Sequence, residues 1–217
     1  MLAISLFDYT GNMLKPWLKA GYECHVIDVQ HTSSSTGDGI TAHNIDLLTR
    51  PQELWMRFAG QDIAFVSAFP PCTHLAVSGA RWFRGKGLSA LAESISLFSV
   101  AADFCESTGA AYLIENPVST ISTYWRKPDH TFHPCDFTNF EVGDNYTKKT
   151  CLWTGGGFVM PSASKADLGD PDNRIHSCPP SPERSSFRSA TPMGFARAVF
   201  ESNAQRQGKC TNQQTDD

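Results

Sequence analysis

The sequence lacks closely spaced cysteine pairs. Its seven cysteines include no C-x-x-C spacing, and their number is odd. At 217 residues the chain is also much longer than a small secreted disulfide scaffold, so the simplest interpretation is a reduced, cytosolic protein. Two H-x-C spacings, at 133/135 and 176/178, could in principle bind zinc. They match no common zinc knuckle, and no metal site is predicted.

The sequence also lacks an excess of positive charge and a long apolar run. Lys and Arg number 18 against 22 Asp and Glu, which gives a formal net charge of -4. This balance argues against a strong, nonspecific DNA clamp, although a local basic field could still bind DNA. The apolar N-terminal residues have no basic region and no small-residue cleavage site, so they predict a buried strand and not a signal peptide. No segment approaches the length of a membrane span, and we expect a cytoplasmic protein with no membrane partner.

The pattern of elements predicts one α/β domain. Strand-like and helix-like segments alternate in the first half of the chain, which favours a mostly parallel, twisted sheet. The predicted strands are residues 2–7, 23–29, 40–47, 62–68 and 110–114, and the predicted helices are 13–20, 51–58, 88–108 and 191–203. The domain is expected to span residues 1–204, with an irregular, loop-rich insertion at about 126–190 that holds one strand-like island at 150–153. Residues 205–217 are expected to form a disordered tail.

Two of the predicted strand ends indicate a nucleoside-containing cofactor. In a parallel α/β sheet, ligands bind where the strands end at their carboxyl edge. The first strand ends in the tight turn Phe7–Asn12, which leads into a helix. The second ends at Asp28, about 20 residues further on, where a carboxylate could accept hydrogen bonds from a ribose diol. An ordinary turn followed by a surface aspartate would have the same pattern.

A third strand end carries a candidate nucleophile. Pro70 and Pro71 fix the backbone and place Cys72 rigidly at the edge of the sheet. With His74 and Arg81 close in sequence, a thiolate there could be favoured and exposed to a substrate. The alternative is a buried structural cysteine.

The next major strand is predicted to stop at Glu115-Asn116-Pro117. In a doubly wound sheet this strand end and that of Cys72 can lie side by side. A carboxyl group there could stay protonated in a partly dry pocket and donate a hydrogen bond to a ring nitrogen. Such a pair suits addition to a pyrimidine, in which the thiolate adds at C6, the acid stabilises charge at N3, and C5 becomes nucleophilic. The alternative is a glutamate that caps the following helix.

Taken in order, LFDYTGN, Asp28, FPPC, ENP, YTKKT and RSATP resemble the motifs of the cytosine-C5 DNA methyltransferases, particularly the short versions found in phage-like genomes. The resemblance covers about residues 1–200. It implies a Rossmann-like methyltransferase fold with S-adenosylmethionine as cofactor, and catalytic roles for Cys72, Glu115 and Lys148. The cofactor-binding residues that it implies are Phe7, Asp8, Gly11, Asp28, Val29, Asn44, Ile45 and Pro71. The substrate-binding residues that it implies are Asn116, Arg81, Lys149 and Arg188.

The sequence departs from the family pattern at several positions. Tyr9 and Asn12 replace two glycines of the cofactor turn, and Thr73 stands where a glutamine usually follows the cysteine. Lys148 and Thr150 replace two arginines, and a lysine cannot form the bidentate contact that arginine makes with phosphate. Only about 40 residues separate YTKKT from RSATP, the interval in which the family carries a much larger target recognition domain.

The reaction implied by the resemblance is methylation of cytosine C5 in DNA. The target base would be flipped out of a duplex or arrive single-stranded, because C6 cannot be attacked within the base stack. Two other hypotheses stay open: C5 modification of a free pyrimidine nucleotide, and a catalytically silent protein that binds a cofactor or nucleic acid. The basic and aromatic segment at 81–86 could grip phosphates and enter a base stack, or it could be a solvated, mobile loop.

Overall fold

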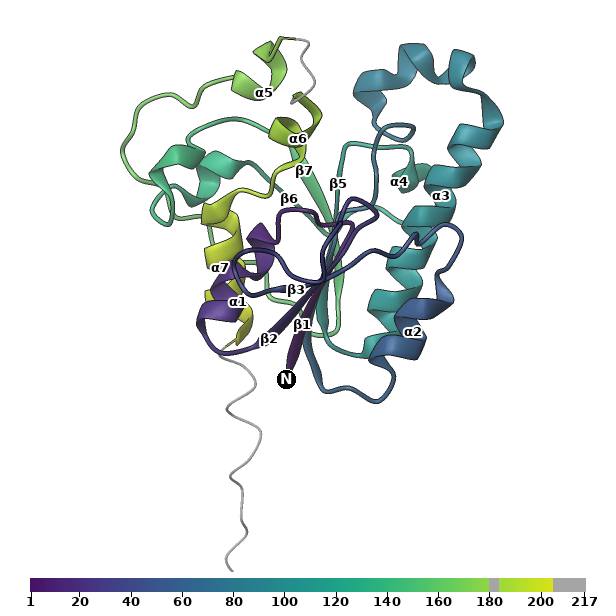
Figure 1. Cartoon of the computed structure of the whole chain (residues 1–217). Coiled ribbons are helices and arrows are strands. Elements are labelled where there is room, and N and C mark those ends of the chain that lie inside the picture. Colours follow the sequence, from purple (N-terminus) through teal and green to yellow (C-terminus); the bar gives the residue numbers. More distant parts are fainter. Residues whose placement is uncertain (180–183, 205–217) are drawn as a thin grey trace, which may run out of the picture.

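The computed structural model describes residues 1–179 and 184–204, and these residues form three layers with a sheet in the middle (Figure 1). The strands of this sheet are β1 Leu2–Leu6, β2 Glu23–Ile27, β3 Thr41–His43, β4 Ile63–Ala68, β5 Ala111–Pro117, β6 His130–Phe132 and β7 Thr150–Gly155. Their order across the sheet is β3-β2-β1-β4-β5-β7-β6. The α/β class and the mostly parallel sheet are therefore as predicted.

The strand order reverses between β1 and β4. Strands β1 to β5 are parallel, whereas β7 runs antiparallel to both β5 and β6. From β1 the chain moves outward to β2 and β3, and it then crosses back to β4 on the other side of β1. Ligands of open α/β sheets bind outside the carboxyl ends of the strands where the order reverses in this way. The turns that follow β1 and β4 both lie at this point.

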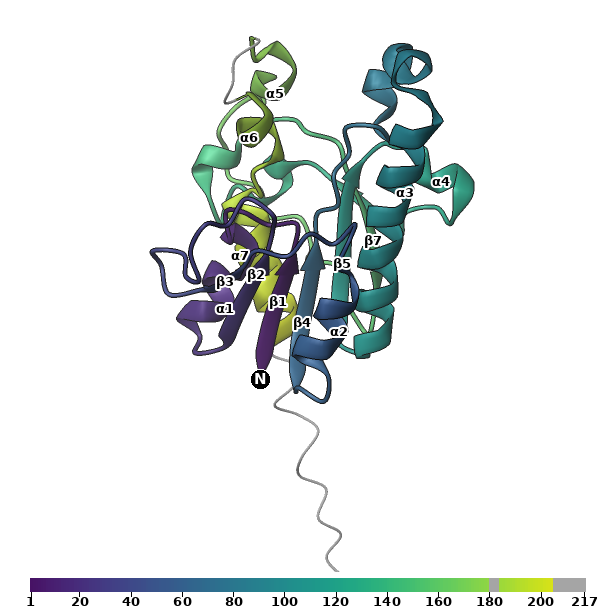
Figure 2. The ribbon, with the colours of Figure 1, turned by 45° about the vertical axis from the view of Figure 1, so that its right-hand side comes forward.

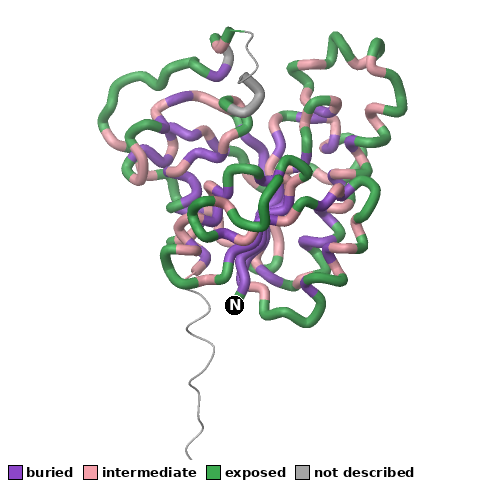
Figure 3. Tube along the Cα trace, viewed as in Figure 1, coloured by how far each residue is buried: buried purple, intermediate pink, exposed green. Residues whose placement is uncertain are grey.

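Helices cover both faces of the sheet. The helices α1 Lys15–Lys19 and α7 Met193–Ala204 lie on one face, and α2 Gln52–Phe58 and α3 Phe83–Thr108 lie on the other (Figures 1 and 2). Both faces of β1 are therefore covered, and all five of its residues are buried. Leu2, Ile4 and Leu6 pack toward α2 and α3, while Ala3 packs toward α1 and α7. The burial of the strands between the two helical layers is evident in Figure 3.

Some boundaries differ from the prediction because they depend on distant partners. The third predicted strand is reduced to Thr41–His43, and the first predicted helix begins with a 3₁₀ turn at Asn12–Leu14. Strand β5 does not stop at Ile114, as predicted, but continues to Pro117. It continues because β7 pairs with its last residues in antiparallel register. Pro117 can end the strand because a proline at the end of a strand removes little of the ladder.

The predicted insertion at 126–190 contributes two strands to the sheet. It supplies both β6 and β7, and it also contains α5 Arg174–Ser177 and α6 Arg184–Ser189. A short helix, α4 Ile121–Tyr124, links β5 to this region. The predicted tail at 205–217 lies outside the described residues.

One helical segment, Val77–Thr108, is long and apolar enough to cross a membrane by length and composition, so the expectation that no segment reaches that length was wrong. In the structure its C-terminal part is a layer of the α/β fold, with Phe98, Ala101, Phe104 and Cys105 in the core. Gly87, at φ 79° and ψ 177°, interrupts the helix. The turns before this kink rise above the carboxyl edge of the sheet (Figures 1 and 2).

Candidate functional site

The turn after β1 is built around the carboxylate of Asp8, which is only 4% exposed. Its Oδ1 accepts hydrogen bonds from the backbone N–H groups of Thr10 at 2.9 Å and Gly11 at 2.8 Å. Its Oδ2 accepts from the Ser5 hydroxyl at 2.8 Å, and the Ser67 hydroxyl donates to that of Ser5 at 2.9 Å. A chain of buried hydrogen bonds thus joins β4, β1 and the turn. Asp8 therefore shapes the turn, since both of its oxygens are already used within the protein.

The same turn contains unusual backbone conformations. Phe7, at φ 55°, is the only non-glycine residue with a positive φ among the described residues. Gly11 has φ 65°, and a Cβ added there would lie 2.9 Å from Cδ1 of Ile40. Side chains are disfavoured in this left-handed region, and such strained positions cluster at ligand-binding sites. The turn is therefore tightly constrained, as turns at ligand-binding sites often are.

The strand end at Asp28 offers a free carboxylate oxygen. Oδ1 of Asp28 accepts hydrogen bonds from the backbone N–H of Gln30 at 2.8 Å and from its side-chain amide at 3.2 Å. Within the described part of the chain no residue bonds Oδ2, which is therefore available to a ribose hydroxyl. The Asn44 amide donates to the carbonyl oxygens of Val29 and His31, both at 2.8 Å. Asn44 and Val29 thus hold the rim of this strand end together.

His31 links the first two strand ends, and the sequence analysis did not identify it. Its Nε2 lies 3.1 Å from the carbonyl oxygen of Asp8. Its ring stacks on that of Tyr9, with the ring centroids 5.4 Å apart. Tyr9 itself is 56% exposed, so its ring lies at the surface over His31. No local motif marks His31, which lies in a Ser/Thr-rich stretch that is typical of a loop.

The third strand end places Cys72 beside β5. The carbonyl oxygen of Cys72 accepts hydrogen bonds from the N–H groups of Leu75 at 3.0 Å and Ala76 at 2.9 Å, which closes a tight turn. The side-chain amide of Asn116 donates to the carbonyl oxygen of Pro70 at 2.9 Å. Asn116 is 1% exposed, so this hydrogen bond is shielded from water. The ends of β4 and β5 therefore lie side by side and are joined.

Three charged groups act on the half-buried thiol of Cys72. Burial raises the pKa of Cys72 and the charge of Glu115 raises it further, whereas the charges of Lys148 and Arg188 lower it. The Lys148 ammonium lies 3.6 Å from Oε1 of Glu115, and these side chains are 15% and 17% exposed. Glu115 thus faces a cation as well as a partly dry pocket. The structure brings Cys72, Glu115, Lys148 and Arg188 into one cluster.

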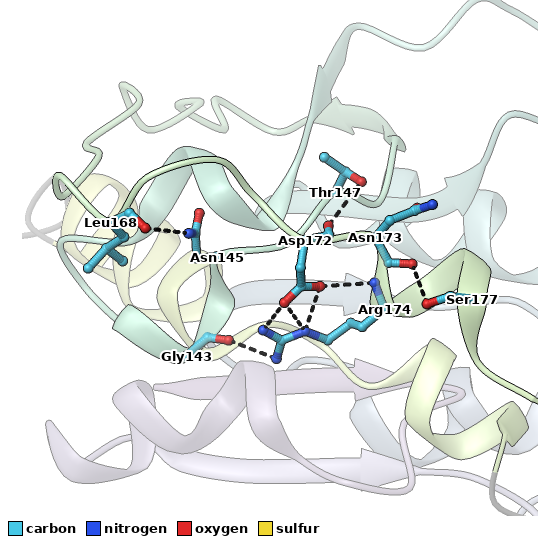
Figure 4. A network of polar contacts seen from close by, with 8 residues as sticks. All are labelled: Gly143, Asn145, Thr147, Leu168, Asp172, Asn173, Arg174 and Ser177. Carbon is cyan, nitrogen blue, oxygen red and sulfur yellow. Dashed lines mark hydrogen bonds and ion pairs between the residues drawn. The ribbon is translucent and has the colours of Figure 1, made fainter.

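A polar network holds the segment that carries Lys148 (Figure 4). The N–H of Thr147 donates to the carbonyl oxygen of Asp172 at 2.9 Å, and the N–H of Asp172 donates to that of Asn145 at 3.1 Å. The guanidinium of Arg174 binds the carboxylate of Asp172, with Nε at 2.8 and 2.9 Å from its two oxygens. A planar guanidinium fixes a carboxylate more firmly than a single contact does. Arg174 therefore locks the two chain segments together just before Lys148.

Asp144 connects this network to α7. Its Oδ2 accepts a hydrogen bond from the backbone N–H of Gly194 at 2.7 Å in a buried contact. Burial raises the pKa of Asp144, and the Gly194 hydrogen bond opposes that shift. The guanidinium of Arg174 lies 5.0 Å from the centroid of the Tyr146 ring. Sequence reasoning missed Asp144, Asp172 and Arg174, because they lie in a Gly/Asp/Asn-rich stretch that is typical of a solvated loop.

Comparison with known proteins identifies the fold. No protein-family model and no curated protein matches the sequence. Among solved structures, a candidate DNA modification methyltransferase encoded within an E. coli prophage superposes with a TM-score of 0.50 at 11% identity. The likeness shows the fold alone, and the chain shares the Rossmann-like α/β fold of that protein. The match covers 83% of this chain and 56% of the other, so this chain spans little more than half the length of that protein.

Three residues selected from the sequence lie apart from the Cys72 cluster. Arg81 is exposed and lies 4.9 Å from the centroid of the Trp82 ring. Lys149 is exposed, and its charge opposes the rise that burial causes in the pKa of Cys151. Ile45 is 2% exposed and belongs to the hydrophobic core. No group of three His, Cys, Asp or Glu side chains among those described could hold a metal ion, and the side chain of His176 lies outside them.

The first two strand ends fit a nucleoside-containing cofactor. Phe7 is partly buried against the core at the end of β1, where an aromatic face can stack on a base. The unbonded oxygen of Asp28 and the left-handed turn at Gly11 lie at adjoining strand ends. Phe7 suits an adenine and Asp28 suits a ribose. The turn at Gly11 suits a part of the cofactor that lies close to the backbone.

Proposed function

We propose that this protein is an S-adenosylmethionine-dependent methyltransferase that methylates C5 of cytosine in DNA in the cytoplasm. The observation that carries this proposal is the cluster of Cys72, Glu115, Lys148 and Arg188 at the adjoining ends of β4 and β5. A half-buried thiol beside a carboxyl group and two cations suits covalent addition to a pyrimidine ring. The fold supplies the second support, because β4, which ends just before Cys72, is one of the two strands between which the strand order reverses.

S-adenosylmethionine would be held at the ends of β1 and β2. Its sulfonium supplies the methyl group and the driving force for the transfer. Phe7 stacks on the adenine, Oδ2 of Asp28 accepts from the ribose diol, and Gly11 lets the backbone approach. Pro71 separates this region from Cys72 and orients the chain that follows. Asp8 acts indirectly, through the hydrogen bonds that shape the turn.

The chemistry begins with a protonated Cys72, because burial and Glu115 raise the pKa of its thiol. The Cys72 thiol gives its proton to the Glu115 carboxylate, Lys148 and Arg188 favour the resulting thiolate, and this thiolate adds to C6 of the cytosine. As the S–C6 bond forms, the C5–C6 π electrons move onto C5, and the protonated Glu115 shares its proton with N3. After C5 has gained the methyl group, a base removes the C5 proton. The electron pair then restores the C5–C6 double bond, the S–C6 bond breaks to release the Cys72 thiolate, N3 returns its proton to Glu115, and Glu115 returns it to Cys72.

The target cytosine must reach Cys72 outside a base stack. The first turns of α3 and the segment with α5 and α6 stand on either side of the carboxyl edge (Figures 1 and 2). In this arrangement, DNA would lie across the edge, double-stranded with one base flipped out or single-stranded. Arg188 on α6 contributes from the insertion side and Asn116 from β5.

The test is transfer of a labelled methyl group from S-adenosylmethionine to DNA. We expect incorporation into cytosine-containing DNA, none into DNA without cytosine, and a loss of at least about 10³-fold in Cys72→Ser. Cys178→Ser is the matched control, since Cys178 is also half-buried but lies outside the cluster, and it should leave the rate unchanged. DNA containing 5-fluorocytosine should form a denaturant-stable complex with the wild type and none with Cys72→Ser, because fluorine at C5 cannot leave as a proton does.

Two outcomes would contradict the proposal in different ways. Transfer to free dCMP without transfer to DNA would identify the substrate as a nucleotide. Measurable binding of S-adenosylmethionine without transfer to either acceptor would identify a catalytically silent binder.

A further inference from the structure

Unsatisfied polar atoms gather between the Cys72 loop and the end of β5. Seven buried side-chain polar atoms lack a hydrogen-bond partner in the described residues. Four of them belong to this region: Nδ1 of His74, Oδ1 of Asn116, Oγ of Ser119 and Oγ1 of Thr120. Buried polar groups in folded proteins are nearly always hydrogen-bonded, so this concentration calls for an explanation.

The two segments that carry these atoms are joined backbone to backbone. The N–H of Thr120 donates to the carbonyl oxygen of Leu75 at 3.0 Å, and the N–H of Val77 donates to that of Val118 at 2.9 Å. An isolated antiparallel bridge pairs Ala76 with Ser119. The backbone is thus satisfied, while the side chains of the same segments are left without partners. Ordered water or a bound group would satisfy them.

A cavity of about 260 Å³ lies next to this region, and His74 and Thr120 both line it. Phe83 and Leu88 from α3 and Tyr124 from α4 form the apolar part of its wall. Rotation of the His74 imidazole or the Thr120 hydroxyl would turn these atoms toward the cavity. The cavity therefore offers flat apolar surfaces together with a small number of hydrogen-bonding groups.

The rim of the cavity is positively charged and rich in exposed aromatic rings. Arg84 and Lys86 line it, and the Lys86 ammonium is held by the carbonyl oxygen of Thr73, next to Cys72. Tyr124 is 62% exposed. Aromatic faces combined with cations are the features with which proteins bind unpaired nucleotides, since the rings stack on bases and the cations attract phosphates.

Two exposed tryptophans extend this surface. Trp82 is 59% exposed and Trp125 is 40% exposed. An arginine guanidinium lies over each indole ring. That of Arg81 is 4.9 Å from the centroid of Trp82, and that of Arg126 is 4.5 Å from the centroid of Trp125. Arg126 is paired with Asp129, so the cations that the cavity itself offers are Arg84 and Lys86, in a chain with a formal charge of -4.

We propose that this cavity binds a second nucleotide of the DNA, distinct from the cytosine at Cys72. The base enters between Phe83 and Tyr124, its polar edge contacts His74 and Thr120, and its phosphate lies at Arg84. This inference rests on the proposed function, because it takes DNA as the substrate. It adds a base-reading site on the α3–α4 side of the Cys72 loop, opposite the short insertion at 126–190.

The test measures binding of a fluorescent single-stranded oligonucleotide by anisotropy, without cofactor, so that no turnover is needed. Thr120→Val keeps the shape of the side chain and removes the hydroxyl, and we expect affinity to fall about threefold to tenfold. Tyr124→Ala should weaken binding by about tenfold, because it removes a stacking ring. Thr123→Val is the matched control on the same helix, since Thr123 is exposed and does not line the cavity, and it should bind as the wild type does.

A panel of oligonucleotides that varies the bases around one cytosine provides the second readout. The wild type should prefer certain neighbours, and Thr120→Val should reduce that preference. Arg84→Gln, an exposed substitution that leaves the core intact, should lower the slope of log affinity against log salt by about one. This variant keeps the test decisive if Thr120→Val folds poorly.

The outcomes separate the two proposals. If the wild type methylates DNA while Thr120→Val, Tyr124→Ala and Arg84→Gln bind and discriminate as the wild type does, the cavity proposal is wrong and the proposed function stands. If the wild type binds no oligonucleotide and transfers no methyl group to DNA, the proposed function is wrong as well.

Discussion

Replacing Gly11 by alanine tests the strained turn after β1. The new Cβ would have to adopt φ 65°, which costs an L-residue about 1–2 kcal/mol. It would also lie 2.9 Å from Cδ1 of Ile40, whereas its distance of 3.7 Å from Val26 is an ordinary contact. Overpacking typically costs about 1–3 kcal/mol, and the lower end applies because Cδ1 is the far end of a flexible side chain. The expected loss in the free energy of unfolding is about 2–3 kcal/mol.

A double-mutant cycle separates the two causes. Ile40→Val removes the methyl group that the new Cβ meets, at a cost of about 1 kcal/mol by itself. The double variant should therefore be about 1 kcal/mol more stable than the sum of the single changes, while the backbone cost remains. Gly21→Ala isolates that backbone cost, because Gly21 has φ 89° and a Cβ added there would have no neighbour within 4 Å.

Urea unfolding of the four proteins in the cycle and of Gly21→Ala, followed by linear extrapolation, measures these free energies. If the losses of Gly11→Ala and Ile40→Val add to within about 0.3 kcal/mol in the double variant, the new Cβ does not meet Ile40. An unchanged stability in Gly11→Ala would refute the left-handed conformation itself. The same variants can be titrated with S-adenosylmethionine, and Gly11→Ala should bind it more weakly than Gly21→Ala does.

Three further predictions concern titration and buried hydrogen bonds. Because the pKa of Cys72 is raised above 9.0, its alkylation by iodoacetamide, followed by peptide mass spectrometry, should keep accelerating above pH 9, and Glu115→Gln should move the profile to lower pH. Burial, followed by the charge of Arg57, lowers the pKa of His43 from 6.5 to about 4. At His43 the folded state therefore binds fewer protons than the unfolded state. The stability that depends on a neutral His43 is complete above pH 6.5 and is lost as the pH falls toward 4. Urea unfolding at pH 7 and about pH 4.5 should show a loss of up to ~2–3 kcal/mol that His43→Asn reduces, and equal losses in both proteins would contradict the assignment. Asp144→Ala leaves the buried N–H of Gly194 unpaired and should cost about 1–3 kcal/mol in urea unfolding, whereas Asp144→Asn keeps an acceptor and should cost less.

The features that the sequence predicted well are those that local chemistry determines. The turn at Phe7–Asn12, the acid at Asp28 and the proline-stiffened Cys72 each follow a buried strand, and parallel strands bring such ends to one edge. Glu115 could be placed near Cys72 for the same reason.

The features that the sequence did not predict depend on distant pairings. Strand β6 has three residues and no alternation to reveal it, and β5 reaches Pro117 only because β7 pairs with it from about 35 residues away. Lys148 reaches Glu115 through a network that joins residues near 145 to Asp172 and Arg174. Such polar contacts between loops leave no periodic pattern in a single sequence.

The network around Arg174 also determines where this chain can lengthen. Asp172 and Arg174 close a loop onto residues 143–147, so the position of Lys148 depends on that closure and not on the length of the connection before it. Gly169 and Asp170 lie in that connection, both are exposed, and nothing lies within 4 Å of a Cβ added at Gly169. Doubling the length of a flexible loop costs only about 0.6 kcal/mol in closure entropy. An additional segment could therefore be inserted between Gly169 and Asp170 without moving Lys148, and under the proposed function such a segment could read additional bases.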